Sequence, residues 1–308
     1  MVLSKVAAIE IGSNAVRLLI SRVQKQSDGF ELKKELLLRI PLRLGEDSFT
    51  LGEISENRVD KLIKVMNSFR YLMNVYQVDI YRAYATSAMR DAKNNEEIVR
   101  IIKEKAKIDL KVITGAQEAK IIFESHAADS LRLDKNYLYV DVGGGSTEIS
   151  LIINGALADY KSFNVGTIRM LHGKVAYKEM KEMKSYLKNL QKDFAPVEII
   201  GSGGNINKLF RLSKTPKTQA LTTIKLQEIY NELTQYTLEE RISTFDLKPD
   251  RADVIIPACE LFLKIAEVSN ITTINVPTIR LVDGIVHSIL EEVNIHRLQS
   301  DQKLISNI

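Results

Sequence analysis

The chain has 308 residues, of which 45% are hydrophobic and 27% are charged, so it is long enough to form two domains with sizeable cores. Its formal net charge of +4 does not favour a nucleic-acid-binding protein, although cationic side chains gathered at one cleft would attract an anionic ligand. No run of about 18 apolar residues occurs, and the single cysteine, Cys259, excludes an intramolecular disulfide. We therefore expect a cytoplasmic protein with no membrane span and no nucleic-acid partner.

The first half of the chain opens with strands and then alternates strands with helices. The elements expected in order are strands at 6–11, 17–23 and 30–38, an amphipathic helix over 59–76, a strand at 80–85, a helix ending near 106, a strand at 110–113 and a helix over 117–129. This order is typical of an α/β domain.

The second half restarts the pattern. The elements expected in order are strands at 137–142, 148–153 and 156–163, helices near 166–172 and 177–194, a strand at 197–200, and a mostly helical remainder with one strand at 271–276. An Asn154-Gly155 pair between two of these strands predicts a hairpin turn.

The two halves begin alike, which indicates an internal duplication. AIEIGSNAVRLLI starts at Ala8 and YVDVGGGSTEISLI starts at Tyr139, and each contains an apolar strand, an acid, a glycine turn with serine and a second apolar strand. Two copies of one domain facing each other would bring both turns to a common cleft. We predict domains at 1–130 and 131–308, and the last helix can pack back on the first domain.

The segment DVGGGSTE at 141–148 is the strongest signal for chemistry. Three consecutive glycines let backbone N–H groups converge on an anion, and two hydroxyl groups follow them. The expected phosphate contacts are Gly143, Gly144, Gly145, Ser146 and Thr147. Asp141 and Glu148 flank the turn and suit a hydrated Mg²⁺ that also binds phosphate. An ordinary hairpin needs fewer glycines, so we interpret this segment as a phosphate loop.

Other candidates are weaker by themselves. Gly-Ser-Asn at 12–14 occurs in ordinary turns, and its value comes from its likeness to the second loop. The glycine loop at 201–205 fits an anion site or a tight strand-to-helix connection equally well. Arg90 is expected in a loop at 86–91 after a strand, where it can clamp phosphate or simply be solvated. Glu118 stands at a helix start, where a glutamate usually complements the helix dipole.

Together these segments resemble the exopolyphosphatase and guanosine pentaphosphate phosphohydrolase (Ppx/GppA) family in its short two-domain form. The resemblance rests on the order and spacing of AAIEIGSNAVRLLI, YATSAMRDAKN, ITGAQEAKIIF, YVDVGGGSTEISL, NVGTIRM, IIGSGGNINKL and RADVIIPA, which span nearly the whole chain. It implies two tandem ribonuclease-H-like domains of the actin, Hsp70 and sugar-kinase superfamily, with a Mg²⁺-dependent site in the cleft between them.

The resemblance also implies roles for individual residues. Glu118, in a Gly-x-x-Glu-Ala segment, corresponds to the catalytic glutamate that activates water. Asp141, Glu148 and Glu10 correspond to acids that hold the metal or its water. The implied phosphate contacts are Ser13, Asn14, Arg90 and the loop residues 143–147.

Three positions depart from the family pattern. Glu10 replaces the usual Asp, and its longer side chain should change metal placement, because Mg²⁺ tolerates little geometric error. Gln117 replaces a common second glutamate, and Asn205 stands where threonine is usual. We expect the chain to lack the extra C-terminal helical domain of longer relatives.

The function predicted first is release of terminal phosphate from inorganic polyphosphate. The alternatives are a guanosine pentaphosphate 5′-phosphohydrolase, a kinase or ATPase of the same superfamily, and a sensor that binds guanosine polyphosphate without turnover. Glu10 and Gln117 motivate the sensor, because weaker metal binding would leave a cleft that only binds. A homodimer is compatible with each of these.

Overall fold

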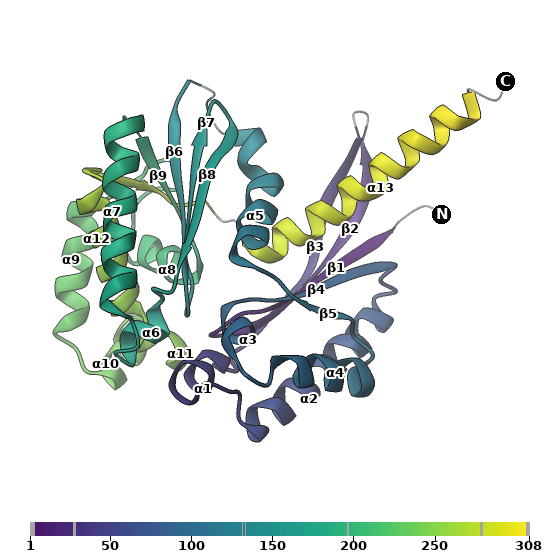
Figure 1. The fold of residues 1–308 in the computed structure, drawn as a ribbon, viewed down its shortest axis with the longest axis horizontal. Coiled ribbons are helices and arrows are strands. Elements are labelled where there is room, and N and C mark those ends of the chain that lie inside the picture. The colour runs from purple at the N-terminus through teal and green to yellow at the C-terminus, as the bar shows by residue number, and fades with distance from the viewer. Residues whose placement is uncertain are drawn as a thin grey trace.

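The computed structural model describes residues 4–26, 29–130, 132, 134–195, 197–277 and 280–305. It contains two sheets, each with its own helices, and the two halves of the chain lie beside each other (Figure 1).

The first sheet has the order β3-β2-β1-β4-β5. Its strands are β1 (Lys5–Ile11), β2 (Val16–Gln26), β3 (Gly29–Ile40), β4 (Ile80–Ala85) and β5 (Leu110–Val112). The first three strands pair antiparallel, whereas β4 and β5 run parallel to β1. The helices of this half are α1 (Leu44–Leu51), α2 (Glu56–Val75), α3 (Ser87–Asp91), α4 (Asn95–Ala106) and α5 (Gly115–Ser130).

The second sheet has the order β10-β11-β9-β6-β7-β8. Its strands are β6 (Asn136–Val142), β7 (Thr147–Ile153), β8 (Ala156–Phe163), β9 (Val197–Ser202), β10 (Leu221–Thr222) and β11 (Thr273–Asn275). The helices that follow β8 are α6 (Thr167–Leu171), α7 (Tyr177–Phe194), α8 (Gly204–Leu212), α9 (Thr223–Thr234), α10 (Leu238–Thr244), α11 (Pro249–Ala252), α12 (Ile255–Val268) and α13 (Leu281–Ile305).

The two sheets repeat one topology, which confirms the predicted fold class. In both sheets three antiparallel strands are followed by two strands parallel to the first, and the second sheet adds β10 at its edge. The hairpin turn predicted at Asn154-Gly155 is present, with φ of 52° and 74°, as a type I′ turn requires.

Two local predictions were wrong. Residues 86–91 were read as a loop, but Ser87–Asp91 forms the short helix α3, so Arg90 is helical. The strand expected to stop at Ile200 continues to Ser202. Gly201 does not break it, because this glycine allows close packing: a Cβ there would lie 2.9 Å from Ile274 Cγ2.

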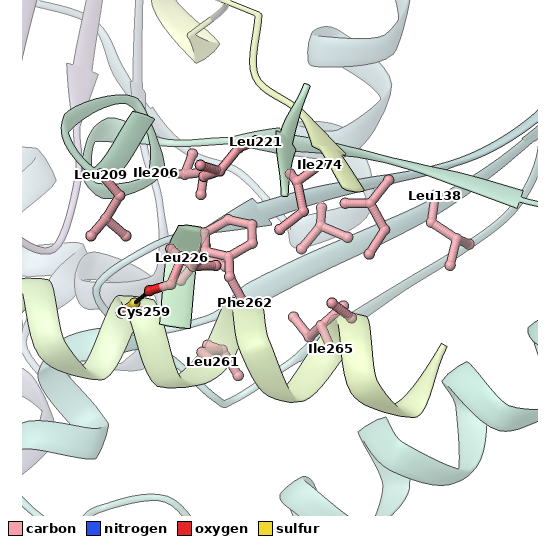
Figure 2. Close-up of a cluster of buried hydrophobic side chains, with 14 of the residues drawn as sticks. Leu138, Ile206, Leu209, Leu221, Leu226, Cys259, Leu261, Phe262, Ile265 and Ile274 are labelled. Atoms are coloured by element: carbon pink, nitrogen blue, oxygen red, sulfur yellow. Dashed lines mark hydrogen bonds between the residues drawn. The ribbon is translucent and has the colours of Figure 1, made fainter. Parts of the chain in front are cut away.

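Each sheet is covered by apolar side chains that form its core. In the second half, helix α12 supplies Cys259, Phe262 and Ile265 to a cluster that also contains Leu138 of β6 (Figure 2). Cys259 is fully buried, as the sequence indicated, and its thiol donates to the Leu226 carbonyl. The residue is therefore part of the core.

Helix α13 leaves the second half and lies along the first sheet (Figure 1). Val282, Ile285 and Ile289 join a cluster with Val6 of β1. Gly284 permits close contact with α5, because a Cβ there would lie 2.6 Å from the Ile121 carbonyl oxygen. Among the described residues, no helix combines the length and apolarity needed to cross a membrane.

Candidate active site

Two glycine turns, one from each half, lie in contact. The first turn (residues 12–15) follows β1 and the second turn (residues 143–146) follows β6. Each is closed by the same hydrogen bond, from Gly12 N–H to Ala15 O at 3.1 Å and from Gly143 N–H to Ser146 O at 2.9 Å. A Cβ on Gly144 would lie 2.9 Å from Ser13 Cβ, so the duplicated segments meet as the repeat predicted.

A cavity of about 240 Å³ opens at this contact and is lined by both halves. Most of the predicted site residues lie on its wall: Glu10, Ser13, Asn14, Glu118, Asp141, Gly143, Gly144, Ser146 and Glu148. Five arginines also line it: Arg17, Arg39, Arg211, Arg251 and Arg280. The cavity therefore combines carboxylates with a group of guanidinium cations.

Three predicted phosphate contacts are not part of this wall. Thr147 is fully buried, and its hydroxyl donates to the Val165 carbonyl at 2.6 Å, which fixes the start of β7 instead. Gly145 packs tightly, because a Cβ there would overlap the Phe49 ring. The Arg90 guanidinium donates to the Ile113 carbonyl at 2.8 Å, close enough to the acids for its charge to favour ionised Glu118.

Glu118 reaches the cavity from the first turn of α5. Gly115 seats that turn against β8, because a Cβ there would overlap the Tyr160 hydroxyl and lie 2.8 Å from Ser162 Cβ. The Glu118 carboxylate is buried, and its Oε2 has no hydrogen-bond partner. Burial raises its pKa well above the usual value, and the charges of Glu148 and Asp141 raise the pKa further.

The acids of the second half are also poorly compensated. Asp141 of β6 lies opposite Glu148 of β7, and burial followed by the charge of Glu148 raises the pKa of Asp141 to about 7. Burial also raises the pKa of Glu148, although its carboxylate accepts a hydrogen bond from Ser162 at 2.9 Å. Perturbed carboxylates that share one cavity are a feature of catalytic sites.

The amide of Asn14 has a defined orientation. Its Nδ2 donates to the Asp250 main-chain oxygen at 2.9 Å, and a carbonyl oxygen can only accept. Because the nitrogen is thus bonded to α11, Asn14 Oδ1 is the remaining group, and it is buried without a partner. In this arrangement Asn14 offers the cavity an acceptor, whereas the phosphate contact implied by the family resemblance would need a donor.

A hydrated Mg²⁺ fits this donor set better than a bare ion does. Within the described ranges, no three His, Cys, Asp or Glu side chains are arranged as a ready metal site. Three buried oxygens without partners nevertheless occur on the cavity wall, at Glu10 Oε2, Asn14 Oδ1 and Glu118 Oε2. Such acceptors suit the water ligands that Mg²⁺ retains while it also binds substrate phosphate.

The arginines and Ser87 were not predicted from the sequence. Ser87, at the start of α3, shares a 2.8 Å hydrogen bond with Ser13. Arg17 and Arg39 lie opposite each other on β2 and β3, a proximity that needs the strand register. Arg251 lies in RADVIIPA and Ser87 lies in YATSAMRDAKN, two of the segments that carry the family resemblance. Their place in these segments was the sequence signal that could have identified them.

The duplicated topology, with a cavity between its two halves, is that of the actin-like ATPase fold. The model of the Ppx/GppA phosphatase family matches residues 23–293, and the chain belongs to this family. The chain thereby belongs with the phosphoanhydride hydrolases.

Relatives of different lengths match the chain. Exopolyphosphatase 2 of Mycobacterium tuberculosis is 26% identical, over 94% of this chain and 99% of its own length. The bifunctional 3-dehydroquinate synthase/phosphatase of Fusobacterium nucleatum is 29% identical over 81% of this chain, which spans only 41% of that protein. The guanosine-5′-triphosphate,3′-diphosphate pyrophosphatase of Aeromonas salmonicida is 22% identical, over 92% of this chain and 59% of its length.

Solved structures show the same fold. The Ppx/GppA family member of Aquifex aeolicus has a TM-score of 0.75 at 27% identity, over 95% of this chain and 99% of that chain. An exopolyphosphatase from Cytophaga hutchinsonii has a TM-score of 0.81 at 23% identity, over 94% of this chain and 98% of that chain, and it supports the fold alone.

Proposed function

We propose that the protein releases the terminal phosphate of inorganic polyphosphate in a reaction that requires Mg²⁺. The observation that carries this proposal is the composition of the cavity, where Glu118 and its neighbouring acids share one wall with five arginines. A phosphate chain carries negative charge along its whole length, so it matches several guanidinium groups better than a single phosphate does.

The chemistry assigned to the protein is in-line hydrolysis. Glu118 accepts one proton of the attacking water, whose oxygen forms the new bond to the terminal phosphorus. The bond from phosphorus to the bridging oxygen breaks, and its electron pair leaves with the shortened chain. The Ser13 hydroxyl and the second turn, at Gly144 and Ser146, hold the terminal phosphate oxygens, while the arginines stabilise the leaving chain.

The raised pKa of Glu118 suits this role. A carboxylate with an ordinary pKa is a weak base, and burial among acids strengthens its affinity for a proton. Asp141, Glu148 and Glu10, with Asn14 Oδ1, would hold a hydrated Mg²⁺, which when bound supplies positive charge to the phosphate oxygens.

Polyphosphate is favoured over guanosine pentaphosphate by one feature of the wall. The described residues that line the cavity include no aromatic side chain on which a guanine could stack. The full-length match to a protein named exopolyphosphatase 2 points the same way. The nucleotide phosphohydrolase is the second candidate, and a non-hydrolysing sensor is the third. A cytoplasmic location, the absence of a nucleic-acid partner and a homodimer stay predictions.

Phosphate release tests the three candidates in one assay. The purified protein is incubated with polyphosphate of several lengths, guanosine pentaphosphate or ATP, with Mg²⁺ or with EDTA. We expect the highest kcat/KM for polyphosphate, and no release in EDTA. A higher kcat/KM for the nucleotide would assign the second function, and binding without release in Mg²⁺ would assign the sensor.

A further inference from the structure

Asp250 lies behind the cavity and holds two side chains that line it. The residue belongs to α11 of the second half, and it is only 7% exposed. Its carboxylate forms an ion pair with Arg39 of β3, and Asn14 donates to its Oδ2 at 3.4 Å and to its main-chain oxygen at 2.9 Å. Asp250 is not among the residues on the cavity wall. Asp250 can therefore act on a ligand through Arg39 and Asn14, the two wall residues that it contacts.

Arg39 has donors left over after this ion pair. Its Nη2 is bonded to Asp250, whereas its Nε and Nη1 are buried with no hydrogen-bond partner. A guanidinium N–H that is buried without a partner is costly, so such groups point to a missing ligand. The side chain lines the cavity beside Arg17 and Arg251. An anion in the cavity would satisfy these N–H groups and be attracted by the neighbouring guanidinium charges.

The three guanidinium groups repel one another in the absence of that anion. Burial and the charges of Arg39 and Arg17 lower the pKa of Arg251 to about 10. The guanidinium group is planar and rigid, so an ion pair through one of its nitrogens fixes the directions of its other N–H groups. Asp250 supplies that ion pair for Arg39.

We propose that Asp250 is a positioning residue that fixes the Arg39 guanidinium so that its free N–H groups bind the leaving phosphate chain. The proposal rests on the proposed function, because the leaving chain is that of a polyphosphate. Asp250 comes from the second half and Arg39 from the first, so this subsite exists only while α11 lies against β3.

A competing interpretation gives the opposite result. If the Asp250 carboxylate instead competes with substrate for Arg39, then neutralising it would free the guanidinium and strengthen phosphate binding. If Asp250 positions Arg39, the same change would leave the Arg39 guanidinium without a fixed orientation and weaken phosphate binding. Asp250→Asn therefore separates the two by the sign of the change in KM.

Asp253→Asn is the matched control. Asp253 forms a second ion pair between the halves, with Arg43, through two bonds of 3.1 and 2.6 Å. Neither residue lines the cavity. If the Asp250 carboxylate only tethered the two halves, Asp250→Asn and Asp253→Asn would change KM to a similar extent. Positioning of Arg39 predicts a change in KM for Asp250→Asn alone.

The experiment measures KM and kcat for inorganic tripolyphosphate, together with the unfolding midpoint. Loss of one charge-assisted contact should raise KM roughly 10-fold in Asp250→Asn and in Arg39→Gln, with little further increase in the double variant. Asp253→Asn should stay within about twofold of the wild-type KM.

A lower KM in Asp250→Asn, equal effects of Asp250→Asn and Asp253→Asn, or additive effects in the double variant would overturn the positioning role. Absence of phosphate release by the wild-type protein would instead count against the proposed function. In that case calorimetric binding of tripolyphosphate by the same variants still decides the role of Asp250.

Discussion

The two copies of the strand–turn–strand unit place an acid at the same position but give it opposite neighbours. In the first half, Glu10 of β1 lies opposite Arg17 of β2 and forms an ion pair with it. In the second half, Asp141 of β6 lies opposite Glu148 of β7, so an acid faces an acid. One unit is therefore neutralised within itself, and the other carries buried negative charge.

This difference explains how two copies of one fold can contribute different chemistry to a shared site. In the first copy, Glu10 and Arg17 form an ion pair, and Arg17 also lines the cavity. The second copy keeps two carboxylates whose pKa values are raised, mainly by burial. Glu118 belongs to the first half in sequence but joins these two acids in space. We therefore expect function to depend on the second copy, whose acids are not neutralised by a paired arginine.

The largest effect is expected from Glu118→Gln. Removing the proposed base while keeping the side-chain shape should reduce kcat for polyphosphate by about 10² to 10⁴. Glu124→Gln on the same helix is the control, because Glu124 is exposed and pairs with Lys120 at 3.5 Å. Steady-state phosphate release by the two variants is the measurement. Equal rates in both would remove Glu118 from the mechanism.

A smaller loss is expected from Gly115→Ala, which tests how Glu118 is seated on the second half. The new Cβ would overlap the Tyr160 hydroxyl and lie 2.8 Å from Ser162 Cβ, both of β8, so either these side chains or the first turn of α5 must shift. A displacement of about 1 Å at a catalytic group can cost on the order of 10² in rate. We expect kcat to fall by up to that factor, with a smaller change in KM.

Rescue provides the control for this variant. Tyr160→Phe removes the overlapping oxygen, so the double variant Gly115→Ala with Tyr160→Phe should regain part of the lost kcat. A double variant no more active than Gly115→Ala would show that the Tyr160 contact does not set the position of Glu118. Thermal unfolding of each variant separates this effect from a loss of folded protein.

The sequence predicted the duplicated fold because hydrophobic periodicity and turn residues are local signals. The pairing of Asp141 with Glu148 was visible as two acids flanking three glycines, although their raised pKa values depend on burial. The grouping of the arginines around one cavity was not predictable, because Arg39 and Arg251 are brought together by tertiary contacts, although Arg251 lies in a segment that carries the family resemblance. Thr147 shows the opposite case. It lies in the predicted phosphate loop, but its hydroxyl donates to the backbone carbonyl of Val165.

The smallest change is expected in stability, and its sign should differ between the two copies. Folding raises the pKa of Asp141 from 3.8 to about 7, so the folded protein keeps this proton at a pH where the unfolded chain has lost it. The contribution of Asp141 to the free energy of unfolding is therefore fully present below about pH 4. It is lost as the pH rises to about 7. Asp141→Asn does not titrate, so at pH 8 it should be more stable than the wild type by about 1–3 kcal/mol.

Glu10→Gln should do the reverse. It leaves the Arg17 guanidinium, 17% exposed, without its anionic partner, which should lower the free energy of unfolding by about 1–3 kcal/mol. Urea unfolding at pH 5 and pH 8 measures both variants, and the advantage of Asp141→Asn should be larger at pH 8. If both variants were destabilised equally at pH 8, Asp141 would be as well compensated as Glu10. The electrostatic difference between the copies would then not hold, and the reactivity of the second copy would need another physical source.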